Sequence, residues 1–286
     1  AKQKNYRTCL LAKGKTNITI RGRGFLDFSL LPWHARNPIV ISDCRHVTVE
    51  GVTLINAPAW NLNINRCEDV TVRNIKIYGY RENSDGIDIV SSQSVHVSDC
   101  FLRTGDDAVV VKAMTPPPVC GGKDILVERC TVWNDKVRCF GIAAETRNDI
   151  TDVTFRNCDV IRSYADWTLE LGALVVYICD RGTISRVTFE DIRIEHEVKF
   201  ATNVMITKDF WSQDEQVGHI RDIVFKNIRV DSVVPSHVAG YDESHPVSGV
   251  TYAQVSLAGK VAECPDDLGL EIGPYVEGIR VFSTGD

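Results

Sequence analysis

"NITIRGRGF" (residues 17–25), "HVTVEGVTL" (46–54) and "DVTVRNIKI" (69–77) follow one nine-residue pattern. Further copies of this pattern begin at residues 94, 124, 152, 186 and 222. Positions 2 and 4 are apolar, position 6 is usually Asn, Asp or Gly, and positions 7 and 9 are mostly apolar. This alternation predicts two short strands joined by a bend.

The repeat also predicts the fold class. Its copies begin 23 to 36 residues apart and carry no helical periodicity. A strand-only unit of this length indicates an all-β, right-handed parallel β-helix, in which corresponding residues of successive turns stack about 4.8 Å apart. The Leu-x-x-Leu-x-Leu spacing of a leucine-rich horseshoe is missing, and the Asn-Gly turns of an antiparallel sandwich are scarce. We expect a single domain over residues 1–286, and the early start of the repeat favours a missing N-terminal cap or preceding segment.

Composition excludes several classes of partner. The chain has 286 residues, a formal net charge of −6 and a hydrophobic content of 44%. Without a basic stripe or a long apolar run, we expect neither nucleic acid nor membrane as a partner. "AKQKNYRTCLLAKGK" (1–15) lacks the apolar core of a signal peptide. No Cys-x-x-Cys or His-x-x-x-His spacing indicates a metal site, so we expect no metal or other cofactor. We also expect the protein to be a monomer.

The ten cysteines fit the repeat better than a disulfide framework. Cys100, Cys130 and Cys158 all occupy position 7, where other copies carry Val or Ile. Cysteines that alternate with Val and Ile behave as small buried hydrophobic residues. We therefore expect these three thiols to be buried and unpaired.

Two acidic stretches carry the candidate catalytic residues. "RENSDGIDIV" (81–90) contains Asp85, and "RTGDDAVVVK" (103–112) contains Asp106 beside Asp107. These stretches lie one turn apart, so three carboxylates meet on one exposed face if Gly105 relaxes the backbone. Crowding raises the pKa of one carboxyl, as a glycosidase requires of its acid. Asn-Ser-Asp-Gly and Thr-Gly-Asp-Asp are also ordinary turn sequences, and spacing alone does not choose between the two interpretations.

Residues 17–113 resemble the polygalacturonase family of glycoside hydrolases. "YRENSDGIDIV" (80–90) and "RTGDDAVVVKA" (103–113) match the Asn-Thr-Asp and Gly-Asp-Asp motifs that this family carries one turn apart. The resemblance implies a pectin-lyase-like β-helix that cleaves a polysaccharide or oligosaccharide, such as pectin, with inversion. It also implies a secreted or periplasmic location.

The same resemblance assigns roles to individual residues. Asp106 is the general acid, and Asp85 together with Asp107 positions and deprotonates the attacking water. Asn83 is a substrate-binding candidate.

The second half of the chain departs from the family. The family's Gly-His-Gly motif is replaced by "NDKVRCFGIAAETRND" (134–149), which contains no histidine. Its Arg-x-Lys motif, which holds the galacturonate carboxylate, is replaced by "ELGALVVYICDRG" (170–182). Without this cationic clamp, substrates with a uronate at the cleaved residue should be poor. "CTVWNDKVRCFGI" (130–142) faintly resembles the dextranase-like family, which acts on neutral glucan and also lacks the clamp.

Three further residues are candidates for substrate binding. Lys112 could supply positive charge to the cleft, although a solvated strand lysine is the simpler interpretation. Arg138 and Glu145 lie in the turn where the family places its histidine, and they could bind sugar hydroxyls or form an exposed ion pair. Three tryptophans could line a sugar cleft or belong to the core: Trp133, Trp167 and Trp211.

The motifs leave more than one function open. An inverting polygalacturonase-like hydrolase is the first interpretation, because all three aspartates are present. A dextranase-like hydrolase of neutral glucan and a non-catalytic carbohydrate-binding β-helix are the alternatives. A lyase or epimerase would need a basic residue and calcium beside a uronate, and the sequence has no such cluster.

Overall fold

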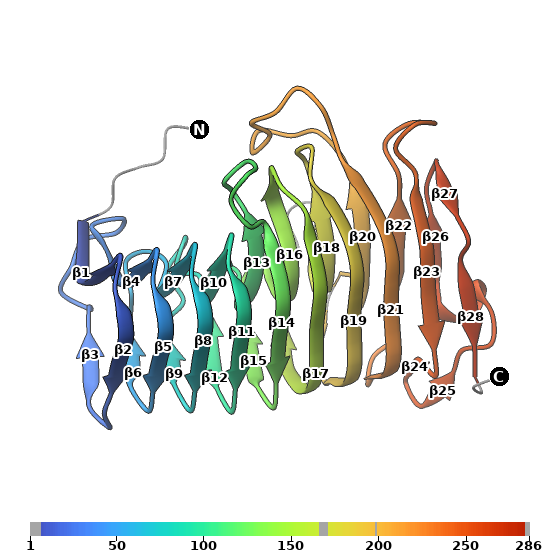
Figure 1. The fold of residues 1–286 in the computed structure, drawn as a ribbon. Coiled ribbons are helices and arrows are strands. Elements are labelled where there is room, and N and C mark those ends of the chain that lie inside the picture. Colours follow the sequence, from blue (N-terminus) through green and yellow to red (C-terminus); the bar gives the residue numbers. More distant parts are fainter. Residues whose placement is uncertain (1–6, 166–170, 198, 284–286) are drawn as a thin grey trace.

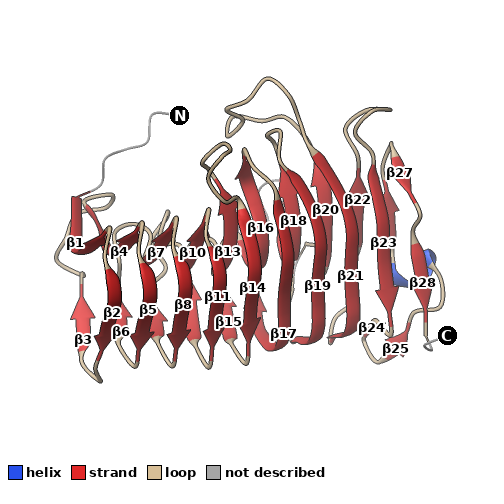
Figure 2. Cartoon of the chain, viewed as in Figure 1, coloured by secondary structure: helices blue, strands red, loops and turns tan. Residues whose placement is uncertain are grey.

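The chain winds into successive turns of parallel strands, as the repeat predicts (Figure 1). The structure is a computed structural model that describes residues 7–165, 171–197 and 199–283. These residues form a right-handed parallel β-helix, and their one helical segment is the short 3-10 turn η1, Pro265–Leu268 (Figure 2). No described helix is long and apolar enough to cross a membrane. The all-β prediction is confirmed.

One long sheet forms the face that carries the acidic motifs. It is called sheet A below, and its strands pair in parallel in chain order. From the N-terminal end they are β1 Arg7–Lys13, β4 Arg36–Ser42, β7 Leu62–Asn65, β10 Ile87–Val90, β13 Val109–Ala113, β16 Arg138–Thr146, β18 Gly172–Ile178, β20 Thr202–Ile206, β22 Ser236–Ala239 and β26 Leu270–Ile272.

The nine-residue repeat forms the rest of each turn. Its first half gives β2 Thr16–Arg21, β5 Arg45–Glu50, β8 Glu68–Arg73, β11 Gln93–Ser98, β14 Gly122–Glu128, and the first parts of β17 Ile150–Ser163, β19 Thr183–Ile194 and β21 His219–Val230. Its second half gives β3 Phe25–Asp27, β6 Thr53–Ile55, β9 Lys76–Tyr78, β12 Phe101–Thr104 and β15 Thr131–Asn134, and the later parts of β17, β19 and β21. Beyond the last copy, the same stack continues with β23 Val247–Ala253, β24 Ser256–Leu257, β27 Val276–Glu277 and β28 Arg280–Phe282. Among the described strands, only β24 and β25 (Lys260–Val261) pair antiparallel.

Position 6 of the repeat marks the bend between the two halves. In every copy after the first, the backbone there is left-handed, with φ of 53° at Asn74, 56° at Asp99 and 49° at Asn157. Asn and Asp tolerate this conformation better than other residues with a side chain, and Gly tolerates it freely. The preference for Asn, Asp or Gly at position 6 therefore has a backbone cause.

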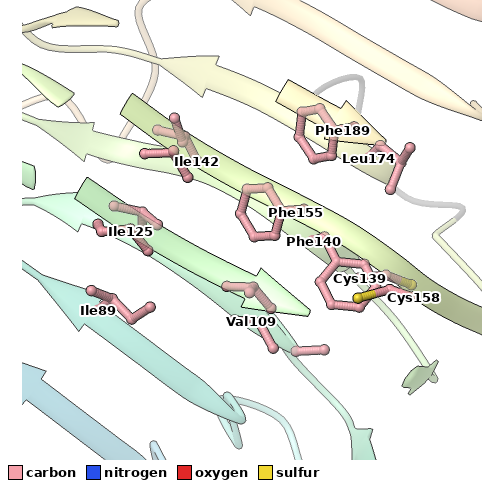
Figure 3. Close-up of a cluster of buried hydrophobic side chains, with 14 of the residues drawn as sticks. Ile89, Val109, Ile125, Cys139, Phe140, Ile142, Phe155, Cys158, Leu174 and Phe189 are labelled. Carbon is pink, nitrogen blue, oxygen red and sulfur yellow. The ribbon is translucent and has the colours of Figure 1, made fainter. Parts of the chain in front are cut away.

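Identical positions stack along the core. Phe155, Phe189, Phe225 and Tyr252 form a ladder whose successive ring centroids lie 4.9, 5.0 and 5.0 Å apart. Figure 3 shows Phe155 and Phe189 on neighbouring turns, with the sulfur of Cys158 inside the same core. Offset stacks of this kind stabilise the fold beyond the apolar area that they bury.

The cysteine prediction is confirmed. Cys100, Cys130 and Cys158 are at most 3% exposed, and all three are free thiols. They continue the ladder of Ile75 and Ile192 at position 7. Hydrogen bonds with the thiols of Cys100 and Cys158, together with burial, hold the pKa of Cys130 well above its usual range.

Sheet A contains one irregularity. The register between β13 and β16 shifts after Val111, which pairs with Ile142, so that Ala113 pairs with Thr146. Beyond this bulge the outer face of sheet A carries a small apolar cluster, separate from the main core, that consists of Ala144, Val175, Tyr177, Cys179 and Met205.

The stacked thiols give a test of the fold. In the native protein, a thiol reagent should reach at most Cys9, Cys264 and the half-buried Cys120, because the structure buries the other seven. In denaturant without reductant, all ten cysteines should react. Fewer than ten reactive thiols after unfolding would mean that disulfides are present and that the stacking of free thiols is wrong.

Candidate active site

Asp85, Asp106 and Asp107 meet where two successive turns enter sheet A. Asp85 precedes β10, and the Asp106–Asp107 pair precedes β13. The backbone N–H of Gly86 donates to the carbonyl of Asp107 at 2.7 Å, which holds the two segments one strand spacing apart. One carboxylate oxygen of each aspartate lies within 4.8 Å of the others. The three predicted catalytic side chains therefore lie together.

Tight backbone contacts fix the turn before Asp106. A Cβ on Gly105 would lie 2.4 Å from the carbonyl oxygen of Arg81, so only glycine fits there. The backbone of Gly105 is not left-handed, so this glycine serves close approach and not the backbone relaxation expected from the sequence. Asn134 Nδ2 and Thr104 Oγ1 both donate to the carbonyl of Asp106, at 2.6 and 2.7 Å. These contacts hold the carboxyl pair in one orientation.

Lys112 lies beneath the carboxylates and is only 4% exposed. Its Nζ lies 3.1 Å from Asp85 Oδ2, 3.0 Å from Asp88 Oδ1 and 3.7 Å from Asp107 Oδ2. The ring of Trp60 covers the same ammonium at 4.0 Å. Lys112 thus brings positive charge to the site, as expected, but as a buried partner of three aspartates, which excludes the solvated strand lysine.

Arg138 holds the opposite side of Asp107. Its Nη1 lies 3.0 Å from Asp107 Oδ1 and donates to Oδ2 at 3.1 Å. The guanidinium carbon also lies 6.0 Å from the ring of Tyr177 on the next turn. Because Arg138 is buried, the exposed ion pair considered from the sequence does not describe it.

The other two candidates lie at the margin of the site. Asn83 is half-buried in a left-handed conformation with φ of 62°, and its Nδ2 atom is buried without a hydrogen-bond partner among the described residues. Glu145 is half-buried in β16, close enough for its charge to raise the pKa of Lys112. Their expected role in substrate binding stays a prediction.

Sequence reasoning missed Asp88. This residue is fully buried in β10 and forms an ion pair with Lys112. A charged residue inside the apolar run "GIDIV" (86–90) was the available signal, since strands are depleted in Asp. The group called the carboxyl cluster below comprises four aspartates and two cations: Asp85, Asp88, Asp106, Asp107, Lys112 and Arg138.

Burial dominates the electrostatics of the cluster. It raises the pKa of Asp106 well above the usual range, and the charges of Asp85 and Asp107 raise it further. Burial and the charge of Asp88 likewise raise the pKa of Asp85, although Lys112 opposes the shift. The pKa of Asp88 rises to about 7, because burial outweighs the stabilising effect of Lys112. Burial lowers the pKa of Lys112, but the surrounding carboxylates outweigh it and raise that pKa.

The segment expected to take the place of a cationic motif is apolar. Ala173, Leu174, Val175 and Val176 in β18 are all fully buried. Of the tryptophans considered for sugar binding, Trp133 contacts the guanidinium groups of Arg103 and Arg162, and Trp211 is 37% exposed on the loop after β20. Trp167 lies outside the described residues.

Comparison with known proteins shows similarity over most of the chain, well beyond the two acidic motifs. The model of glycosyl hydrolases family 28 matches residues 9–266. A polygalacturonase of Juniperus ashei is 27% identical over 239 residues, which cover 79% of this chain and 44% of that protein. An exopolygalacturonase of Zea mays is 24% identical and is matched over 81% of this chain and 55% of its own length. The chain thus spans about half the length of these curated relatives.

Solved structures share the fold. The hyperthermoactive exopolygalacturonase from Thermotoga maritima superposes with a TM-score of 0.66 at 19% identity, over 87% of this chain and 55% of that one. The polygalacturonase from Erwinia carotovora ssp. carotovora gives a TM-score of 0.63 at 16% identity, over 96% and 73% of the two chains. The family model covers most of the chain, including both acidic motifs, and the chain therefore belongs to glycosyl hydrolase family 28, the polygalacturonase family.

Proposed function

We propose that this protein cleaves glycosidic bonds of a polysaccharide with inversion of the anomeric carbon. The observation that carries the proposal is the arrangement of the three aspartates: Asp106 is half-buried, whereas Lys112 binds the buried Asp85 and Arg138 binds the buried Asp107. Glycoside hydrolysis needs a protonated acid and an ionised carboxylate on opposite sides of the bond, and cations favour the ionised form of the carboxylates that they bind.

Asp106 is the proposed general acid. It is the most exposed of the four aspartates in the carboxyl cluster, so a leaving-group oxygen can reach it. Its Oδ1 accepts the N–H of Asp107 at 2.9 Å, which leaves Oδ2 to carry the proton. A carboxyl whose pKa lies above its usual range keeps that proton closer to neutral pH.

Asp85 and Asp107 are proposed to hold the attacking water. Asp107 is bound on both oxygens by Arg138, and Asp85 Oδ2 is bound by Lys112. Asp85 Oδ1 has no hydrogen-bond partner among the described residues, so it is the oxygen proposed to accept the proton of the water. The two carboxylates then share one water, and neither needs to attack the sugar directly.

The charge balance of the carboxyl cluster supports a retained proton. With every group ionised, four aspartates would face two cations in a buried site. Uncompensated buried charge costs several kcal/mol, so the cluster holds protons at neutral pH that solvated aspartates would lose.

The spacing of the carboxyls makes the stereochemistry an informative test. Inverting enzymes commonly separate acid and base by about 6.5–9.5 Å and retaining enzymes by about 5–5.5 Å. The oxygens here approach within 4.8 Å, nearer to the second class. Inversion is proposed because Lys112 and Arg138 hold Asp85 and Asp107 in ion pairs, so that neither carboxylate is free to attack the sugar.

The substrate is proposed to be a polymer that is not anionic at the cleaved residue. Both cations of the carboxyl cluster are engaged by aspartates, and the segment Ala173–Val176 is apolar. A buried uronate would therefore lack a charged partner. A dextranase-like action on neutral glucan fits the same observation.

A secreted or periplasmic location suits a polymer substrate, because long polysaccharides do not cross membranes. The carboxyl cluster is built within one chain, which supports action as a monomer.

Substitution of Asp106 tests the mechanism. Asp106→Asn removes the proton donor but keeps the shape, and it should lower kcat by about 10²–10⁴-fold in a reducing-end assay on a polysaccharide that the unmodified protein cleaves. Asp85→Asn and Asp107→Asn should each lower kcat by a similar order. The variant that carries both substitutions should lose much less activity than the product of the two separate fold-losses. Proton NMR of fresh product should give the inverted anomer.

Asp99→Asn is the matched control, since Asp99 pairs with Arg129 on another face. Full activity of Asp106→Asn would assign the aspartates to turn formation, whereas a retained anomer would make one of them a nucleophile.

Substrate charge can be tested at constant linkage. Homogalacturonan and its carboxyl-reduced form have the same backbone, but only the first carries uronates. We expect kcat/KM to be at least about tenfold higher for the reduced polymer, because one missing charge-assisted hydrogen bond costs about 1.5–3 kcal/mol. Dextran serves as the neutral glucan. Faster cleavage of the unreduced polymer would show that a basic residue elsewhere binds the uronate.

The raised pKa of Asp88, about 7, predicts a pH effect on stability. Asp88 keeps its proton up to a higher pH in the native protein than in the unfolded chain. Its contribution to the free energy of unfolding is therefore complete below about pH 4 and is lost as the pH rises to about 7. Asp88→Asn removes this loss. Its free energy of unfolding should therefore rise relative to the unmodified protein between pH 4 and 7, by at most about 4 kcal/mol.

Denaturant titrations at several pH values measure this difference. The control Asp99→Asn removes a group whose pKa is lowered by Arg129, so its relative stability should change only at acidic pH and in the opposite direction. A pH-independent difference for Asp88→Asn would contradict the raised pKa of Asp88.

A further inference from the structure

The loop of residues 207–218, between β20 and β21, presents two large aromatic side chains to solvent. Phe210 is 68% exposed and Trp211 is 37% exposed, and their ring centroids lie 4.4 Å apart. Figure 1 shows this loop rising beyond the strand ends and bending toward the earlier turns. Exposed apolar surface of this kind commonly marks a binding site.

The base of the loop is fixed by ionic contacts to one buried carboxylate. Asp214 accepts hydrogen bonds from Arg147 and Arg181, at 3.0 and 2.7 Å to Oδ1. The backbone N–H groups of Gln213 and Asp214 donate to Asp180 Oδ1 at 2.6 and 2.8 Å. Hydrogen bonds from Arg181 and Arg147 keep the pKa of Asp214 near 2 despite its burial. These contacts hold residues 213 and 214, at the base of the loop, in a fixed position.

The tip of the loop is hydrogen-bonded to the outer face of sheet A beside the carboxyl cluster. The hydroxyl of Tyr177 donates to Asp209 Oδ2, and the N–H of Trp211 donates to Asp209 Oδ1 at 2.7 Å. The ring of Tyr177 lies 6.0 Å from the guanidinium carbon of Arg138, which binds Asp107. A continuous chain of contacts thus joins the aromatic pair to the carboxyl cluster.

The spacing suits a sugar residue away from the cleaved bond. β20 lies three strands beyond β13, or about 14 Å along the axis at the usual strand separation. Pyranose rings have apolar C–H faces that stack on aromatic side chains, and a rigid platform loses little conformational entropy on binding. We propose that Phe210 and Trp211 form a stacking subsite for a pyranose residue of the polysaccharide substrate.

This subsite depends on the proposed function only for its choice of ligand, so binding should be measured without turnover. The full chain carrying Asp106→Asn is titrated calorimetrically with carboxyl-reduced homogalacturonan oligosaccharides and with dextran oligosaccharides of increasing length. In that background, Trp211→Ala and Phe210→Ala should weaken binding of the longest oligosaccharides about tenfold. The loss should shrink as the oligosaccharides shorten.

Two further variants separate stacking from folding. Trp211→Phe keeps an aromatic face and should restore most of the affinity, whereas Phe25→Ala removes an equally exposed ring (70%) from β3 and should change nothing. Tyr177→Phe removes the anchor of the tip and should weaken binding less than Trp211→Ala does. Equal melting temperatures verify that each variant is folded.

The outcomes distinguish this subsite from the catalytic proposal. Unchanged affinity in Trp211→Ala at every length would overturn the subsite, even if the unmodified protein hydrolyses polysaccharide. Length-dependent loss of binding together with no hydrolysis of any polymer would support the subsite and overturn the catalytic role. Concentration-dependent self-association that Trp211→Ala abolishes, without any sugar binding, would overturn the subsite and assign the aromatic pair to a contact between two copies of the chain.

Discussion

Parallel hydrogen bonding between successive turns places each residue beside its counterpart one turn away, at about 4.8 Å. This constraint stacks Phe155 on Phe189 and Cys130 on Cys158, where identical side chains gain from contact. It also sets Asp85 beside Asp107, because Gly86 donates to the carbonyl of Asp107. Stacking on neighbouring turns stabilises aromatic rings, but it brings like charges close together. The register that builds the core therefore also causes the repulsion among the aspartates of the carboxyl cluster.

Features that follow the repeat could be predicted from the sequence. The fold class, the buried thiols and the meeting of Asp85 with the Asp106–Asp107 pair all depend on counting positions within a turn. The preference for Asn, Asp or Gly at position 6 is visible in the sequence, whereas the left-handed backbone that explains it is evident only from the structure. The sequence also indicates that Gly105 is needed, but the reason is the close approach of the Arg81 carbonyl.

Features that depend on long side chains or on loops outside the repeat could not be predicted in this way. Lys112 crosses between turns to reach Asp85 and Asp88, and position counting does not say how far a flexible side chain extends. The motif spacing places Arg138 near the site but does not identify Asp107 as its partner. The clamp of Arg147 and Arg181 on Asp214 joins residues from three different loops, which no local pattern links.

The register shift between β13 and β16 divides the outer face of sheet A into two chemically different halves. Around β10 and β13 the outer face is charged, because it contains Asp88 and Lys112. Around β18 and β20 the outer face is apolar and contains Val175, Tyr177 and Met205. The proposed substrate, a polysaccharide, has chemically distinct ends, so a chain laid along this face in one direction would meet a different environment from a chain laid in the other. The change from charged to apolar side chains thereby gives this face a direction.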